Sequence, residues 1–253
     1  MLIDTHCHLS YEDYDDIDLV IKENRDNGID KIIVSACTKA SIIECLEYVN
    51  KYKDVYLTIG FHPSETDSYT KNEILFLKDI VKKNKKIVGI GEIGLDYHYG
   101  KEDVLIQQEM FREQMTLALE LNLPVVIHSR DATEDTINIL KEFPKVKGVI
   151  HCFSGSVETA KIYVGMGYKI GIGGVITFKN SKLYEVVASI GIDNIVLETD
   201  SPYLTPEPYR GKKNSSKYLI YVAEKVSKIL NLSSENVAIE TTKNACGMFD
   251  LNQ

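Results

Sequence analysis

The sequence predicts an α/β protein built as one (β/α)8 TIM barrel, and three observations carry that prediction. Eight short apolar or β-branched runs occur along the chain, and segments with apolar residues three or four apart alternate with them. The 253 residues match the roughly 250 of such a barrel, and 44% of them are hydrophobic, enough for one large core. No linker rich in Pro, Gly or Ser divides the units, so we expect a single domain over residues 1–253 and a closed barrel in place of an open, doubly wound sheet.

The expected strands are the eight apolar runs. They span Leu2 to Thr5, Lys31 to Ser35, Val55 to Ile59, Ile87 to Ile90, Val125 to His128, Gly148 to His151, Tyr168 to Ile172 and Ile195 to Glu198.

The expected helices are amphipathic stretches between these strands. They cover residues 18–28, 41–52, 73–84, 104–122, 135–143 and the neighbourhood of 180–190. After the last strand, residues 217–231 and 233–249 predict one or two further helices, with Ser233 or Ser234 as an N-cap.

The charge balance limits how the protein could bind a negatively charged partner. The chain has 29 Lys and Arg against 37 Asp and Glu, a net charge of −8, so no basic surface for holding nucleic acid is evident. Bound divalent cations would still supply the positive charge that a phosphate needs. No apolar run is long enough to span a membrane and no secretory signal opens the sequence, so we expect a cytoplasmic protein whose five scattered cysteines are reduced.

Polar side chains stand where the predicted strands end. In a parallel barrel these points meet at one rim, where active sites lie. The side chains are His6 and His8 after the first strand, His62 after the third, Glu92 after the fourth, His128 and His151 at the ends of the fifth and sixth, and Asp200 after the eighth.

The histidines are the first candidates for metal ligands. His6 and His8 are two residues apart on an extended segment, so both imidazoles point to one face and can reach one ion. His128 and His151 each close an apolar run, an unusual position for an unpaired imidazole. The alternative for this pair is two core histidines with satisfied hydrogen bonds.

Two carboxylates complete the candidate set. Glu92 lies between apolar residues and two glycines, so it is expected to be buried, where it could bridge two cations about 3.5–4 Å apart or form a buried salt bridge. Asp200 closes an apolar strand before a proline, where it could hold an ion and deprotonate a water, or only cap a turn. A mixed set of nitrogen and oxygen ligands suits Zn, Mn, Fe or Co, and Mg less well.

Six motifs in order along nearly the whole chain resemble the TatD family of metal-dependent deoxyribonucleases, which belongs to the amidohydrolase-like barrels. They are D-T-H-C-H at 4–8, G-F-H-P at 60–63, G-E-I-G-L-D-Y at 91–97, P-V-V-I-H-S-R at 124–130, H-C-F-S-G at 151–155 and E-T-D-S-P-Y at 198–203.

The resemblance implies a metallo-dependent hydrolase barrel with two divalent ions, Mg, Mn or Zn. His6, His8 and Asp200 would hold one ion, His128 and His151 the other, and Glu92 would bridge them. It also implies hydrolysis of DNA phosphodiesters, with 3′ to 5′ exonuclease action on single strands or 3′ ends and no obligate protein partner. A water activated by the ions would attack phosphorus while Asp200 takes its proton. His62 and Arg210 are candidates to bind a substrate phosphate.

Two other functions stay open from the sequence. A barrel of the same kind could hydrolyse a C–N or C–O acyl bond by the same chemistry. Alternatively, the ions could stabilise a barrel that catalyses nothing.

Overall fold

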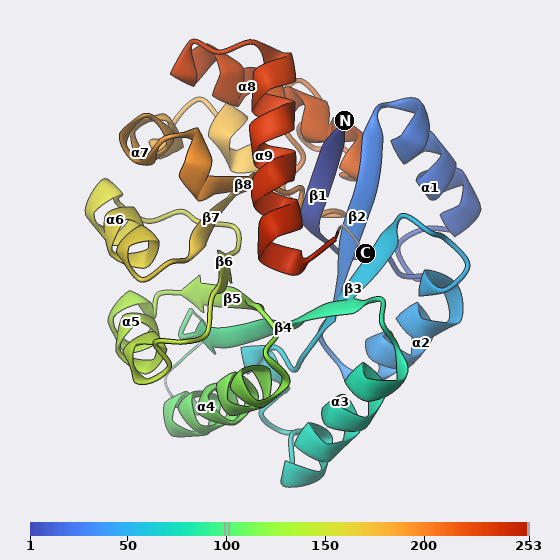
Figure 1. The fold of residues 1–253 in the computed structure, drawn as a ribbon, viewed down its shortest axis with the longest axis vertical. Helices are drawn as coiled ribbons and strands as arrows, with labels where there is room; N and C mark the ends of the chain where they lie inside the picture. The colour runs from blue at the N-terminus through green and yellow to red at the C-terminus, as the bar shows by residue number, and fades with distance from the viewer. Residues whose placement is uncertain (99, 101, 252–253) are drawn as a thin grey trace.

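The structure is a computed structural model that describes residues 1–98, 100 and 102–251. Eight parallel strands form one sheet in the order of the sequence, and each strand pairs with the next (Figure 1). They are β1 (Leu2–Cys7), β2 (Ile29–Ala36), β3 (Val55–Ile59), β4 (Ile87–Asp96), β5 (Val125–Arg130), β6 (Gly148–Ile150), β7 (Lys169–Ile172) and β8 (Ile195–Leu197).

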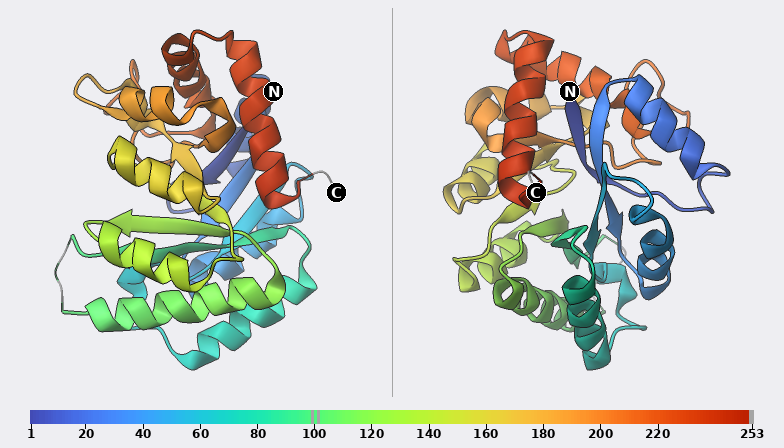
Figure 2. Two further views of the ribbon diagram at one scale, coloured as in Figure 1. Left: turned by 60° about the vertical axis from the view of Figure 1, so that its left-hand side comes forward. Right: turned by 45° about the vertical axis from the view of Figure 1, so that its right-hand side comes forward.

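Helices surround the strands on the outside, as the two further views show (Figure 2). They are α1 (Ile17–Asp26), α2 (Lys39–Val49), α3 (Lys71–Lys83), α4 (Val104–Leu121), α5 (Thr133–Glu142), α6 (Val157–Gly165), α7 (Leu183–Ile190), α8 (Leu219–Leu230) and α9 (Ser234–Phe249). Asp16, Thr38, Ser156 and Ser233 each cap the helix that follows with a side-chain oxygen. Over the described ranges, no helix combines the length and the apolar character needed to cross a bilayer.

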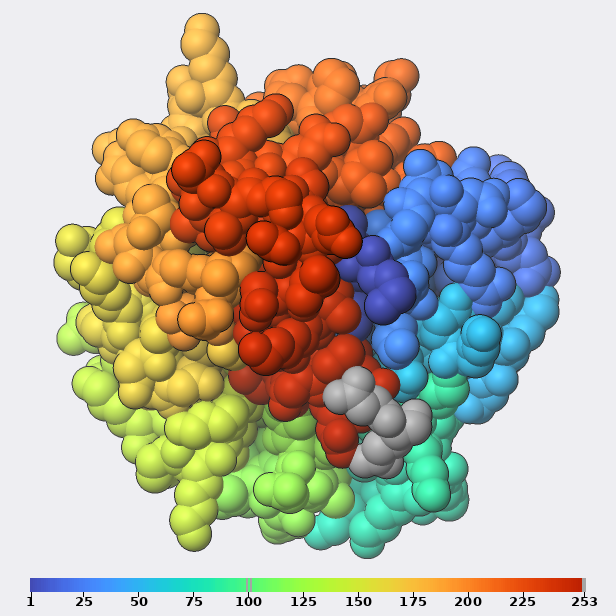
Figure 3. Space-filling view, turned by 45° about the horizontal axis from the view of Figure 1, so that its top comes forward, coloured from blue at the N-terminus to red at the C-terminus, as the bar shows by residue number. Residues whose placement is uncertain are grey.

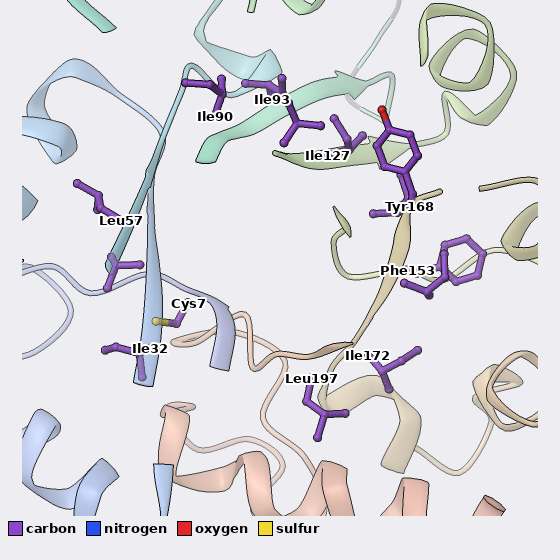
Figure 4. Packing of buried hydrophobic residues seen from close by; sticks show 14 of the residues in the cluster. Cys7, Ile32, Leu57, Ile90, Ile93, Ile127, Phe153, Tyr168, Ile172 and Leu197 are labelled. Carbon is purple, nitrogen blue, oxygen red and sulfur yellow. The ribbon is translucent and has the colours of Figure 1, made fainter. Parts of the chain in front are cut away.

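Successive side chains along each strand point to opposite faces of the barrel wall, which gives two apolar layers. Side chains such as Leu57, Ile127 and Ile172 belong to the large cluster that the strands share with the surrounding helices, and Figure 4 shows members of it around the ring. The other faces of the strands point into the barrel. There, residues including Val126 and Val149 form a smaller cluster.

Helix α9 closes one mouth of the barrel. Its Ala245 and Phe249 pack in the smaller cluster against residues near the beginnings of the strands. The helix crosses in front of the strands in Figure 1 and lies over the middle of the face in Figure 3. The mouth at the carboxyl ends of the strands stays available for a site, the usual place in this fold.

The seam between β8 and β1 is joined by side chains. The Thr5 hydroxyl donates to the Leu197 carbonyl at 3.0 Å. The buried Asp4 carboxylate accepts hydrogen bonds from the Thr199 amide at 2.9 Å and the Thr199 hydroxyl at 2.6 Å. Because the Asp200 amide donates to the His6 carbonyl at 3.0 Å, the same seam holds two candidate ligands side by side.

The predicted barrel and its eight strands are confirmed, with shifts at several ends. The expectation that Glu92 follows the fourth strand is wrong, because β4 continues through it to Asp96. His6 and His128 likewise lie inside β1 and β5. These strands do not end at the first polar residue because each polar side chain meets other polar groups inside the barrel.

Gly94 shows how tightly β4 and β5 approach. Its φ is +143°, and a Cβ there would lie 2.0 Å from the His128 carbonyl oxygen. We expect Gly94→Ala to lower the free energy of unfolding by about 4 kcal/mol, through backbone strain plus displacement of β5. Urea denaturation measures this loss. Gly28→Ala is the control, because φ is +79° there but an added Cβ would meet no atom beyond the neighbouring residues within 4 Å, so about 1 kcal/mol is expected. Equal losses in both variants would contradict the steric argument.

Candidate metal centre

Glu92 lies at the middle of the candidate site. It comes from β4, points into the barrel and is only 4% exposed. Its two oxygens face two different groups of side chains. Oε2 lies 3.5 Å from His6 Nε2, whereas Oε1 lies 2.7 Å from His128 Nδ1 and 2.9 Å from His151 Nε2. This is the placement that a carboxylate needs to bridge two ions.

The first donor group joins β1, β4 and the segment after β8. His6 Nε2 lies 3.3 Å from His8 Nε2, and both nitrogens lie 3.6 Å from Asp200 Oδ1. Glu92 Oε2 is 3.9 Å from His8 Nε2. Ligands about 2.0–2.2 Å from a tetrahedral ion stand about 3.3–3.6 Å from one another, so these separations fit one cation.

Hydrogen bonding fixes which nitrogen of His8 faces the site. Its Nδ1 lies 3.0 Å from the Ser35 carbonyl oxygen, which can only accept, so Nδ1 carries the proton. The lone pair of neutral His8 is therefore on Nε2, opposite His6 Nε2. A metal-binding histidine is commonly oriented in this way by a backbone carbonyl.

The second donor group joins β4, β5 and the end of β6. Alternation places it: Val126 and Val149 belong to the cluster inside the barrel, so His128 and His151, two residues further along, point inward too. Glu92 Oε1, His128 and His151 form one of the described groups whose ligand atoms lie close enough together to hold an ion.

Two carboxylates that the sequence analysis did not select stand behind this group. Asp96 Oδ2 lies 3.1 Å from His128 Nε2, and Glu198 Oε1 lies 3.6 Å from His151 Nδ1. Each histidine thus has one nitrogen toward Glu92 and the other toward a carboxylate, the pairing that orients metal-binding imidazoles. A signal existed for Asp96, because it is four residues after Glu92 on the same strand and so shares its face.

The electrostatics of the site favour bound positive charge. Burial alone would raise the pKa of Glu92, but His151 and the hydrogen bonds from His128 and His151 hold that pKa well below its usual range. Burial and the neighbouring His151 lower the pKa of His6 well below its usual value. The buried carboxylate is therefore ionised, and His6 offers a neutral imidazole.

His62 lies near the same centre, and its hydrogen bonds differ from those of the candidate ligands. The Ser64 amide donates to His62 Nδ1 at 3.1 Å, which leaves the ring proton on Nε2, 3.9 Å from Glu92 Oε1. Burial lowers the pKa of His62 to about 4, so the ring is neutral near pH 7. His62, Asp96 and His128 are close enough to hold an ion, but an Nε2 that carries a proton is a donor and not a ligand.

Arg210 is the one predicted residue that the structure does not bring to this centre. It is exposed in the segment after β8, and its guanidinium stacks on the Phe178 ring at 3.9 Å. Within the described ranges, no hydrogen bond or ion pair joins it to the other predicted site residues. Its predicted contact with substrate stays a prediction.

Asp96→Asn tests the support behind His128. Asparagine keeps an oxygen for the His98 amide, which donates to Asp96 Oδ1 at 2.9 Å, but it removes the negative charge beside His128. We expect metal affinity to fall about 10–100-fold. Competition with a chelator, followed by elemental analysis, measures the change. Asp79→Asn, in an exposed pair with Lys83, is the control, and equal affinities in both variants would contradict the orienting function.

Comparison with known proteins agrees with this geometry. A family model described as "TatD related DNase" matches residues 3–250. The chain is 42% identical to the "uncharacterized metal-dependent hydrolase YabD" of Bacillus subtilis and 34% identical to YcfH of Escherichia coli, which carries the same description. These matches cover 100% of both chains for YabD, and 99% of this chain and 96% of the relative for YcfH.

A solved structure agrees with the whole arrangement of strands and helices. The crystal structure of the TatD homologue YjjV from Escherichia coli superposes with a TM-score of 0.91, at 30% identity and with 98% of each chain covered. A hydrolase of the TatD family from Entamoeba histolytica gives 0.86, at 26% identity, covering 98% of this chain and 97% of that one. The chain therefore belongs to the TatD family of metal-dependent hydrolases.

Proposed function

We propose that this protein hydrolyses phosphodiester bonds of DNA with two divalent cations, acting on single strands or 3′ ends as a 3′ to 5′ exonuclease. One observation carries the proposal: the Glu92 carboxylate lies between two groups of donors, each able to hold one ion. When bound, two such ions lower the pKa of water and neutralise charge that develops on a phosphate. Zn, Mn and Mg are the ions to test, and the nitrogen-rich donor set favours Zn or Mn over Mg.

The side chains at the centre would hold the ions, accept a proton and bind the substrate. His6, His8 and Asp200 would hold one ion, and His128 and His151 the other. Asp200 is the least buried of the carboxylates described at the centre, with 15% of its side chain exposed, so it can reach an incoming water and accept its proton. His62, whose Nδ1 accepts from the Ser64 amide, would donate a hydrogen bond from Nε2–H to a substrate oxygen.

The DNA substrate is favoured over an acyl substrate by the family to which the chain belongs, whose model is described as a DNase. The geometry alone serves either substrate, because the same donors could stabilise an attack on a carbonyl. Hydrolysis of a 3′-labelled single-stranded oligonucleotide, compared with an aryl ester and a lactone in the presence of Mn²⁺, tests the choice. Turnover of the acyl substrates alone would overturn the proposal.

His62 variants test its function as a donor. We expect His62→Ala to lower kcat/KM about 10²-fold, the usual effect of losing one donor to a developing charge. His62→Gln should lose less, because its amide N–H can take the place of Nε2–H. Metal content should be unchanged in both, since a protonated Nε2 binds no ion. Loss of an ion in His62→Ala would show that His62 is a ligand instead.

A further inference from the structure

The segment that follows β8 lies at the open mouth of the barrel, and we call residues 201–213 the β8 loop. It begins directly after Asp200, a member of the first donor group. The fully buried Asn214 ties the end of the loop to its beginning. Its Nδ2 donates to the Thr199 carbonyl at 2.9 Å and to the Tyr203 carbonyl at 2.6 Å. The β8 loop is therefore fixed beside the metal centre.

Tyr203 is the exposed aromatic residue of this loop. It is 59% exposed, and its ring lies 6.1 Å from the His8 ring with 65° between the two planes. Its backbone is held on both sides, because its N–H donates to the Asp200 carbonyl at 2.9 Å and its own carbonyl accepts from Asn214. A flat apolar ring is thus held in place next to a candidate metal ligand, with much of its surface open to a bound molecule.

The other exposed aromatic residues of the described ranges, Tyr11 and Tyr184, are placed differently. The Tyr11 ring stands edge-on to the Tyr48 ring at 6.3 Å. Tyr184 lies on α7, outside the barrel wall, and its hydroxyl donates to Glu185 at 2.9 Å. Within those ranges, an aromatic residue that is both exposed and in contact with a candidate ligand occurs only at Tyr203.

The charges around the mouth favour a phosphate chain on the β8 side. The β8 loop contains three cations and one carboxylate, although the whole chain has a net charge of −8. Arg210 and Lys212 are exposed, and within the described ranges neither forms an ion pair. The β3–β4 side is acidic instead, because a hollow of about 340 Å³ beside His62 is lined by Asp96, Glu102 and Asp103. Such carboxylates repel phosphates.

We propose that the Tyr203 ring stacks on an unpaired nucleobase next to the bond that is cut. Every base has a flat π face, so the ring would require a base without selecting one sequence. A base inside a duplex must first leave its stack, whereas an unpaired base is free to bind. The inference rests on the proposed function and specifies its substrate class: nucleotide chains with an unpaired base beside the scissile phosphate, in preference to a sugar-phosphate chain that lacks this base.

Single strands with one abasic residue test the proposal. The substrates are a 5′-labelled oligonucleotide and two versions of it, in which the last or the next-to-last nucleotide lacks its base. In the wild type, we expect kcat/KM at the 3′ end to be about 10–100-fold lower for one of the two abasic strands than for the intact strand. Equal rates for all three strands would overturn the inference.

Variants of Tyr203 assign this preference to the ring. Tyr203→Ala should cut the intact and the abasic strand equally, because no ring is left to stack, and a preference that persists in this variant would overturn the inference. Tyr203→Phe should keep the preference, since stacking needs only the ring. Its loss there too would assign the effect to the hydroxyl and overturn stacking. Tyr184→Ala, which also removes an exposed tyrosine, is the matched control and should keep the preference.

A binding measurement separates this inference from the proposed function. Calorimetry with deoxyadenosine 5′-monophosphate and 2-deoxyribose 5-phosphate, in the presence of Mn²⁺, reports the base without cleavage of a diester. If only the wild type binds the nucleotide more tightly than the sugar phosphate and no strand is cut, stacking is supported and the proposed function fails. If strands are cut and Tyr203→Ala keeps the preference for the intact strand, stacking is overturned and the function stands. Equal binding of both compounds to the wild type without hydrolysis would overturn both.

Discussion

Glu92→Gln is expected to reduce hydrolysis at least about 10³-fold and to leave the protein with fewer bound ions. The reason is the pair of contacts that one carboxylate makes, with Oε2 toward His6 and Oε1 toward His128 and His151. A glutamine has nearly the same shape but only one oxygen. Its NH₂ group would turn hydrogens toward one of the two donor groups, and the negative charge would be gone. Elemental analysis after dialysis and hydrolysis of a labelled oligonucleotide measure the two losses.

Glu73→Gln provides the matched control for this variant. Glu73 is also a buried glutamate, 9% exposed, but it lies on α3 and pairs with Lys39 at 3.3 Å. It should keep both activity and metal content. A Glu92→Gln protein that retained two ions and normal turnover would show that the carboxylate only balances the charge of buried histidines.

The barrel was predictable because its strands and helices have local signals. Strands such as β3 match the predicted range at both ends, since an unbroken run of apolar, aromatic and β-branched residues lies between Asp54 and Gly60. The end of β4 was not predictable in the same way. A buried glutamate normally argues against a continuing strand, and it is tolerable here because His6 of β1, His128 of β5 and His151 directly after β6 surround it. Those contacts join residues far apart in the sequence.

The site was predictable to the extent that its residues end or interrupt apolar runs. His128 and His151 are conspicuous for that reason, and the structure places both against Glu92. Asp96 and Glu198 were missed because each belongs to a motif in which another carboxylate, Glu92 or Asp200, had already been selected. Their function depends on which ring nitrogen they face, and no sequence pattern encodes this. For Arg210, a position on a polar segment predicts exposure, but it does not predict which way the side chain points. In the structure the guanidinium stacks on the Phe178 ring.

Asp200→Asn should lower kcat about 10²–10⁴-fold, the range for loss of a positioned general base, while at least one ion stays bound. The backbone should tolerate the change, because φ is +55° at this position and asparagine adopts such angles readily. The amide oxygen can still approach His6 and His8, but it accepts no proton from water at neutral pH. We therefore expect a large loss in kcat with a smaller loss in metal content. In Glu92→Gln, by contrast, the loss of bound ions should be pronounced.

Asp250→Asn is the matched control, since Asp250 has φ of +50° at the end of α9, away from the open mouth of the barrel. It separates the effect of the lost carboxylate from that of the backbone angle. Excess metal then distinguishes a base from a simple ligand. Loss of a base lowers kcat at every metal concentration, whereas the loss of a ligand is rescued by excess metal. Full rescue of Asp200→Asn by added Mn²⁺ would therefore reassign Asp200 to metal binding alone.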